Sequence, residues 1–127
     1  MTWDDSPWTA GGLRITRTAL AQVERDAAEG YLAEQEACGY LVGPSSDPLL
    51  CDRAVSLENI AKELHEADPR TFCLEPRSFF AFRERSFDVA VEDGLDRGTP
   101  VKVLYHSHLD AGAYLSGTDE AVLSRGA

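Results

Sequence analysis

Two histidines and a later aspartate are the residues of this sequence best suited to chemistry. His106 and His108 follow the apolar run 101–105, and Asp119 comes eleven residues after the second histidine. Residues two apart in an extended strand point the same way, so both imidazoles are expected on one side and Ser107 on the other. Two imidazoles and a carboxylate are common ligands of a catalytic zinc ion, which keeps a further position open for water.

These residues also have simpler explanations. A His-x-His pair at the end of a strand is compatible with two exposed surface histidines. Ser116 followed three residues later by Asp119 is compatible with the first turn of a helix, which Ser116 would cap. The chain has three histidines, of which two end its most strand-like run while His65 is expected in an exposed polar loop. That concentration favours a metal site, but spacing alone leaves both interpretations open.

Hydrophobic periodicity predicts the elements that lead to these residues. In the first half, apolar residues recur at three- and four-residue spacing in one stretch and run continuously in others. They predict a short strand at 13–15, an amphipathic helix from 16 to about 30, a buried strand over 38–43 that ends in a Gly-Pro turn, and an antiparallel partner over 49–57.

The second half is expected to be a polar loop over 58–70 with one helical turn, then a strand at 71–74. A helix should begin near Pro76, run to about Asp93, and stop at the break over 94–100. The strand 101–105 follows, and a short helix after Gly117. The helix that begins near Pro76 is expected to bury, in part, the residues Phe79, Phe80, Phe82, Phe87, Val89 and Val91. Strands alternating with two main helices predict an α/β (α+β) domain with a mixed sheet.

Composition narrows the classes of function. The chain has 127 residues, a net charge of −10 and no marked Lys/Arg cluster, so nucleic acid is not expected as a partner. No apolar run is long enough for a membrane span and no signal peptide is evident. Three separated cysteines indicate reduced thiols in the cytoplasm. One domain over 13–127 is expected after a loose lead-in, 1–12, in which the roles of Trp3 and Trp8 stay open.

The spacing His-x-His-x7-Ser-x2-Asp, matched by His106, His108, Ser116 and Asp119, resembles the signature of the JAMM (MPN-plus) metalloproteases. Upstream, Glu36 stands in a Glu-x-Cys-Gly context similar to that family's glutamate before a strand. The resemblance spans roughly residues 13–125, and it implies a cytidine-deaminase-like, MPN-type fold with a curved sheet.

The resemblance also implies roles. His106, His108 and Asp119 would hold Zn²⁺, Glu36 would be the general base, and Ser116 would hydrogen-bond the developing oxyanion. Glu34 is the rival base but lacks the Glu-x-Cys-Gly context. Cys38 is not expected to be a nucleophile, because an apolar strand raises the pKa of a thiol.

The implied activity is that of a short prokaryotic-type peptidase or isopeptidase. Its substrate would be the C-terminal tail of a ubiquitin-like or sulfur-carrier protein that ends in Gly-Gly. The alternative is a non-catalytic MPN-type scaffold for protein interactions. Two departures stand out: Leu109 replaces a frequent proline, and the family's further C-terminal strand is not apparent. That strand would come from elsewhere, for example from a second copy in a homo-oligomer, or the sequence is a shortened form.

Overall fold

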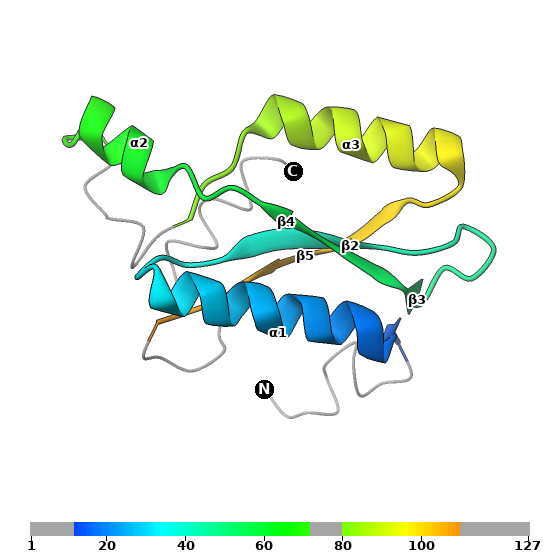
Figure 1. Cartoon of the computed structure of the whole chain (residues 1–127). Helices are drawn as coiled ribbons and strands as arrows, with labels where there is room; N and C mark the ends of the chain where they lie inside the picture. Colours follow the sequence, from blue (N-terminus) through cyan, green and yellow to red (C-terminus); the bar gives the residue numbers. More distant parts are fainter. Residues whose placement is uncertain (1–11, 72–79, 110–127) are drawn as a thin grey trace.

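The core of the fold is a three-stranded antiparallel sheet. The computed structural model describes residues 12–71 and 80–109 of the chain. The sheet has the strand order β4-β2-β5, formed by β4 (Arg53–Leu57), β2 (Cys38–Val42) and β5 (Val101–His106) (Figure 1). The central strand β2 pairs Cys38 with Leu57 on one side and with His106 on the other.

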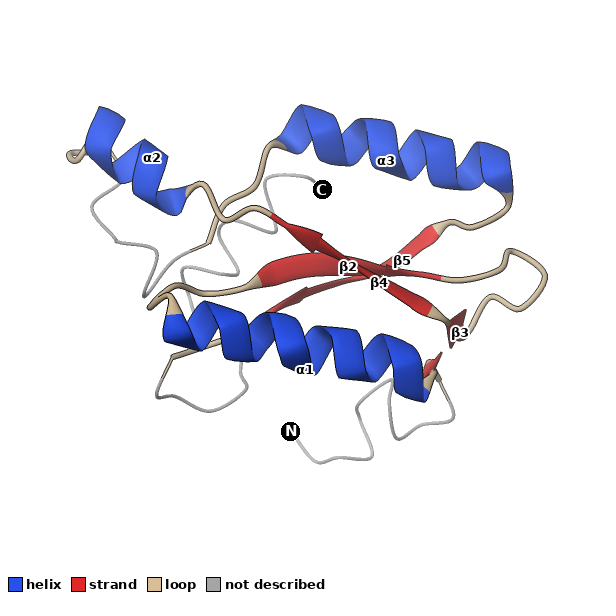
Figure 2. Ribbon diagram, in the orientation of Figure 1, coloured by secondary structure: helices blue, strands red, loops and turns tan. Residues whose placement is uncertain are grey.

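Two long helices cover the two faces of this sheet. Helix α1 (Arg17–Leu32) packs against one face and α3 (Glu84–Arg97) against the other (Figure 2). The shorter α2 (Ala61–Ala67) follows β4. A small parallel sheet of β1 (Arg14–Ile15) and β3 (Leu50–Cys51) lies where α1 begins, and the side chain of Thr16 caps that helix by accepting from the N–H of Ala19. The described elements thus form a mixed α/β fold.

The face covered by α1 holds the aliphatic core. Leu41, Cys51 and Ala54 are buried there, and the half-buried residues Leu13, Ile15, Val23, Val103 and Tyr105 pack around them. The other face is aromatic. Tyr40 of β2 meets Phe87 of α3 edge to face, with ring centroids 5.7 Å apart. Because strand residues alternate between faces, Tyr105 belongs to the α1 face and His106, its neighbour, to the aromatic one.

The predicted α/β class is confirmed, and the strand at 101–106, the strand at 38–42 and helix α1 lie close to their predicted ranges. The predicted partner over 49–57 is divided. Residues 53–57 pair antiparallel with β2 as expected, whereas β3 pairs parallel with β1. The polar segment 58–70 contains a seven-residue helix rather than one turn, and His65 lies on this helix, half-buried, instead of in an exposed loop.

The predicted limits of the third helix were wrong. Residues 80–83 are not helical. Helix α3 begins at Glu84, runs into the predicted break and ends at Arg97, followed by Gly98, whose φ of 73° is left-handed. Gly94 lies inside this helix. Glycine is required there because a Cβ would lie 2.7 Å from the carbonyl oxygen of Thr99. Val89, expected to be partly buried, is 60% exposed. Residue 71 of the predicted strand 71–74 is a turn, and its other residues lie outside the described part of the chain. So do Pro76, Phe79, the lead-in except residue 12, and the segment of the predicted C-terminal helix.

Candidate metal centre

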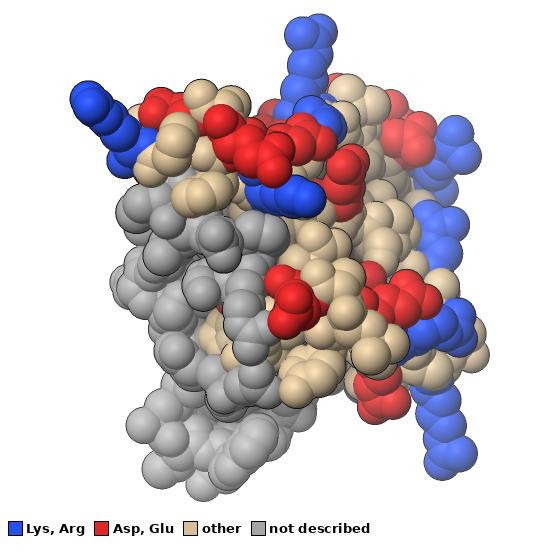
Figure 3. Space-filling model, turned by 60° about the vertical axis from the view of Figure 1, so that its left-hand side comes forward, with Lys and Arg blue, Asp and Glu red and all other residues tan. Residues whose placement is uncertain are grey.

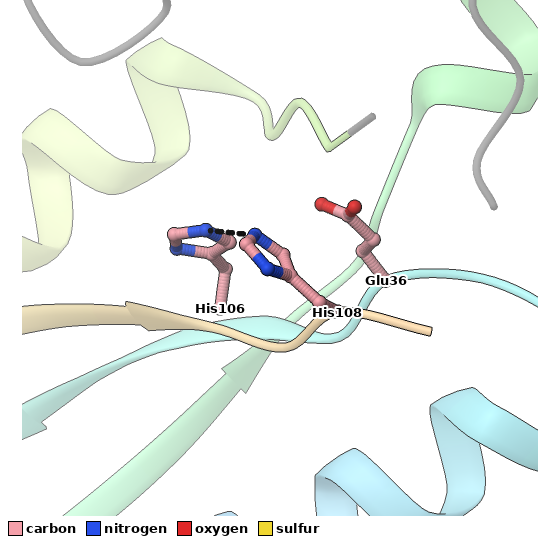
Figure 4. Close-up of side chains that lie close together, drawn as sticks. All are labelled: Glu36, His106 and His108. Atoms are coloured by element: carbon pink, nitrogen blue, oxygen red, sulfur yellow. Dashed lines mark hydrogen bonds between the residues drawn. The ribbon is translucent and has the colours of Figure 1, made fainter. Parts of the chain in front are cut away.

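His106 and His108 lie together at the end of β5. His106 is the last residue of the strand and His108 follows after one residue. Their Nε2 atoms are 3.1 Å apart and their ring centroids 5.0 Å apart (Figure 4). Both rings are half-buried. The alternation expected from the sequence therefore brings the two imidazoles to one side of the chain.

Glu36 completes a group with the two histidines. One carboxylate oxygen and one nitrogen from each imidazole all lie within 4.8 Å of one another. The Glu36 side chain comes from the segment between α1 and β2, and Figure 4 shows it on the same side of the ribbon as the two rings. The residue is 5% exposed. Of the glutamates considered in this segment, Glu36 and not Glu34 belongs to this group.

The end of α1 determines where Glu36 lies. The helix closes with hydrogen bonds from the N–H of Ala33 to Glu29 and from that of Gln35 to Gly30. Between them Glu34 takes a left-handed conformation, with φ 57°. A side chain at Gly30 would come within 2.8 Å of the carbonyl oxygen of Gln35, so glycine permits the chain to return this closely over the helix end. This return directs residues 36–38 into the sheet.

Ser107 joins the two segments of the site. Its N–H donates to the carbonyl oxygen of Ala37 at 2.9 Å, and its Oγ accepts from the N–H of Ala37 at 2.9 Å. The serine between the two histidines thus holds the residue next to Glu36. These hydrogen bonds support the expectation that Ser107 has a structural role.

The ring of Phe80 packs on the imidazole of His106. The two rings are stacked, with centroids 4.6 Å apart and planes 18° apart, and Phe80 is 2% exposed. Phe82 and Phe87 continue the aromatic row toward α3. The sequence suggested that Phe80 lies on a helix; its place against a histidine was missed, and no local pattern signals it.

Asn59 is the second residue near the site whose role was missed. It is 8% exposed, and its side-chain N–H donates to the carbonyl oxygen of Glu36 at 2.8 Å. Its Oδ1 accepts from the N–H groups of Ala61 and Ala81, at 3.0 and 3.2 Å. In the sequence, Asn59 stands out only as a polar residue shortly after a predicted strand, which does not indicate these contacts.

Cys38, which pairs with His106 in the sheet, has a thiol that stays protonated at neutral pH. Burial and, to a smaller extent, the nearby charges of Asp26 and Glu36 together raise the pKa of its thiol to about 12. Its Sγ lies 3.7 Å from the carbonyl oxygen of Leu57. The expectation that Cys38 is no nucleophile is therefore supported by its surroundings.

Ser116 and Asp119, the remaining residues of the expected site, lie outside the described residues. The three that are described offer two imidazoles and one carboxylate, a donor set suited to zinc. Two imidazole nitrogens on one tetrahedral zinc ion would be about 3.3 Å apart, from a Zn–N distance of about 2.05 Å. The 3.1 Å between the Nε2 atoms of His106 and His108 fits such an ion.

The surface around this end of the molecule carries both charges. Figure 3 shows Asp and Glu side chains lying among Lys and Arg on this face, without a continuous basic area among the described residues. On the α1 side, a shallow hollow of about 640 Å³ is lined in part by Arg17, Arg25, Arg53 and Asp52. No helix in the described part of the chain is both long and apolar enough to cross a membrane.

Comparisons with known proteins show the family and the fold of the chain. The solution structure of a Desulfitobacterium hafniense protein is similar, with a TM-score of 0.62 and 24% sequence identity over 85% of this chain. The match covers 64% of that protein, and at this identity it shows the fold alone. A search of curated proteins returned no match. The family model for prokaryotic homologs of the JAB domain matches residues 14–127. In agreement with the JAMM (MPN-plus) resemblance, the chain belongs to this family of prokaryotic JAB-domain homologs.

Proposed function

We propose that this chain is a zinc-dependent peptidase or isopeptidase. The observation that carries the proposal is the group formed by Glu36, His106 and His108, whose donor atoms lie within 4.8 Å of one another in a chain of the JAB-domain family. A structural zinc site normally closes with four protein ligands. A buried carboxylate beside two imidazoles suits a hydrolytic site better, because it can serve as a base next to the metal.

The proposed roles follow the donor chemistry. His106 and His108 would hold Zn²⁺ together with Asp119. A bound zinc ion would supply Lewis-acid assistance, lowering the pKa of water and polarising the carbonyl of the scissile amide. Glu36 would accept a proton from the attacking water and deliver it to the leaving amine as the C–N bond breaks. Ser116 would donate a hydrogen bond to the developing oxyanion.

The substrate part of the proposal rests on the family resemblance. We infer that the bond lies at the C-terminal tail of a ubiquitin-like or sulfur-carrier protein ending in Gly-Gly, so that hydrolysis removes a residue, peptide or adduct attached there. The chain has no marked basic cluster in its sequence, and a protein tail is a better candidate than nucleic acid.

Zinc content and cleavage test the proposal together. The protein is loaded with Zn²⁺, freed of excess metal and analysed for bound zinc, then incubated with ubiquitin-like proteins that carry C-terminal extensions after Gly-Gly. Mass spectrometry should show stoichiometric zinc and products cut after the Gly-Gly tail. The double variant His106→Ala/His108→Ala should lose both the metal and the cleavage. A wild-type protein that takes up no zinc would overturn the hydrolase proposal and favour the non-catalytic scaffold.

A further inference from the structure

We propose that Asn59 is a positioning residue for the hydrolysis proposed above, on which this inference rests. Its side-chain amide binds the backbone of Glu36. It also binds the backbone of Ala81, next to Phe80, whose ring stacks on His106. One buried amide would thus keep the candidate base and a candidate metal ligand in a fixed relation.

The hydrogen bonds of Asn59 determine the orientation of its amide. The nitrogen faces a carbonyl oxygen, that of Glu36, at 2.8 Å. The oxygen faces two backbone N–H groups, those of Ala61 at 3.0 Å and Ala81 at 3.2 Å. The reversed orientation would set donor against donor twice and acceptor against acceptor once, so only one orientation satisfies all three contacts. The side chain is nearly excluded from solvent, which makes each contact costly to lose.

Toward Glu36, the amide controls the peptide plane between residues 36 and 37. Ala37, the next residue, is already held by its two hydrogen bonds to Ser107. Asn59 adds a contact to the carbonyl oxygen of Glu36 itself. Together these contacts limit rotation of the backbone from which the Glu36 side chain leaves. A carboxylate that transfers protons must lie within hydrogen-bond reach of its water, and a misplacement of about 1 Å can cost a factor of about 100 in rate.

Toward His106, the amide acts through the neighbour of Phe80. The N–H of Ala81 donates to Oδ1 of Asn59, and the carbonyl oxygen of Ala81 accepts from the N–H of Ile60 at 2.8 Å. Residues 59–60 therefore hold residue 81 from both sides of its backbone. This fixes Phe80, whose ring covers one face of the His106 imidazole. Packing of this kind restricts the rotation of a ligand ring, which outer-shell partners commonly do in metal sites.

Asparagine is the residue type that this position needs. Aspartate keeps the two acceptor contacts but places an oxygen, which carries negative charge when ionised, against the carbonyl oxygen of Glu36, so it breaks the contact toward the candidate base. Gln22 offers a matched control. Its Oε1 accepts from the N–H of Ala54 at 3.2 Å and ties α1 to β4, among residues outside the Glu36, His106 and His108 group. Gln22→Glu makes the same change from amide to carboxylate.

The test compares Asn59→Asp with Gln22→Glu in the full chain. With a cleavable ubiquitin-like substrate, Asn59→Asp should lower kcat by about 10- to 100-fold with little change in KM, as for other outer-shell residues. The absorption spectrum of the Co²⁺-loaded protein should also change. In the metal-free protein, the backbone amide resonances of Glu36, Ala37 and Ala81 should shift. The imidazole resonances of His106 should shift as well. Gln22→Glu should leave kcat, the Co²⁺ spectrum and these resonances close to the wild type.

The outcomes separate this inference from the proposed function. A folded Asn59→Asp protein with wild-type kcat and unshifted Glu36 and His106 resonances would overturn the positioning role, whatever the wild type hydrolyses. A wild type that binds no zinc and cleaves nothing would overturn the proposed function and, with it, the contribution of Asn59 to catalysis by positioning. If Asn59→Asp gives no cooperative unfolding transition, Asn59→Ser, which adds no charge, is measured in its place with the same expected directions.

Discussion

The two ends of the paired strands β2 and β5 use polar groups in different ways. At the end where β5 begins, the ammonium group of Lys102 donates to the carbonyl oxygens of Pro44, Asp47 and Leu50, at 2.9, 2.7 and 2.7 Å. An ammonium group has three N–H donors, and all three are used within the chain. This end is arranged so that the protein's own groups satisfy one another.

At the other end, donor atoms converge on each other instead. The Nε2 atoms of His106 and His108 are 3.1 Å apart, and the carboxylate of buried Glu36 lies within 4.8 Å of both rings. Gathering such groups costs folding free energy, because each must leave water. One end of the strand pair therefore stabilises the fold, while the other end gathers polar groups at a cost in stability, in the arrangement that the proposed zinc site requires.

The largest effect is expected from Glu36→Gln, which should affect function alone. Glutamine has the shape of glutamate but cannot accept the proton, so kcat should fall by about 100- to 10,000-fold, the usual contribution of a general base. Bound zinc and the thermal midpoint should change little. Metal analysis, calorimetry and the mass-spectrometric cleavage assay measure these three quantities.

Glu34→Gln is the matched control for this change. It makes the same substitution two residues earlier, outside the group of donor atoms. Its kcat should equal that of the wild type. Full activity in Glu36→Gln, or an equal loss in both variants, would contradict the assignment of Glu36 as the base.

Lys102→Met should have the opposite profile, with a loss of stability alone. It removes three hydrogen bonds from a charged donor, and we expect the free energy of unfolding to fall by about 2–4 kcal/mol. Zinc binding and kcat, measured well below the thermal midpoint, should stay at wild-type values. Lys62→Met, on the exposed surface of α2, is the control and should change stability by less than about 0.5 kcal/mol. Equal midpoints in denaturant for the two variants would contradict the role of Lys102.

The two ends also differ in how far the sequence predicts them. The His-x-His spacing and the Glu-x-Cys-Gly context are local patterns, and the alternation of a strand was enough to predict that the two imidazoles share a side. The contacts of Lys102 were not predictable, because its three acceptors come from the turn after β2 and the start of β3, more than fifty residues earlier, and are backbone atoms that any residue type provides.

The same reason explains the misplaced start of α3. The aromatic spacing of residues 79–82 fits a helix, but Ala81 pairs with Ile60 and Asn59, and Phe80 stacks on His106. These long-range contacts outweigh the local preference, and they involve the residues that hold the candidate site together. Asp119 and Ser116 stay sequence-based predictions, since they lie outside the described residues.

The dependence of stability on alkaline pH tests whether the Cys38 thiol, next to the candidate site, is shielded from water. Because burial raises the pKa of this thiol to about 12 from an ordinary value of 9.0, the folded state keeps a proton that the unfolded state loses. The free energy of unfolding should therefore fall as pH rises from 9 toward 12, by at most about 1.4 kcal/mol per pH unit for this proton. Burial also raises the pKa of Tyr105, which adds to the fall.

Cys38→Ala should make this decline shallower, as measured by denaturant unfolding at a series of pH values. Cys51→Ala is the control. Its thiol is also buried and its pKa also raised, but less strongly, so removing it should change the slope less. Parallel curves for Cys38→Ala and the wild type between pH 9 and 11 would mean that water reaches this strand.

The smallest effect is expected from Glu34→Gly, which tests whether the return of the chain before Glu36 is strained. Glu34 has a φ of 57°, a conformation that glycine adopts without steric cost, so the variant should be more stable by about 0.5 kcal/mol, part of the gain being offset by the greater freedom of the unfolded chain. Glu29→Gly, on the exposed side of α1, should instead be less stable by about 1 kcal/mol. Chemical denaturation measures both, and kcat should not change in Glu34→Gly. Destabilisation of both variants by the same amount would mean that the left-handed conformation of Glu34 costs the fold no free energy. The cost at the end of the molecule that bears the candidate site would then come from the burial of its polar groups alone.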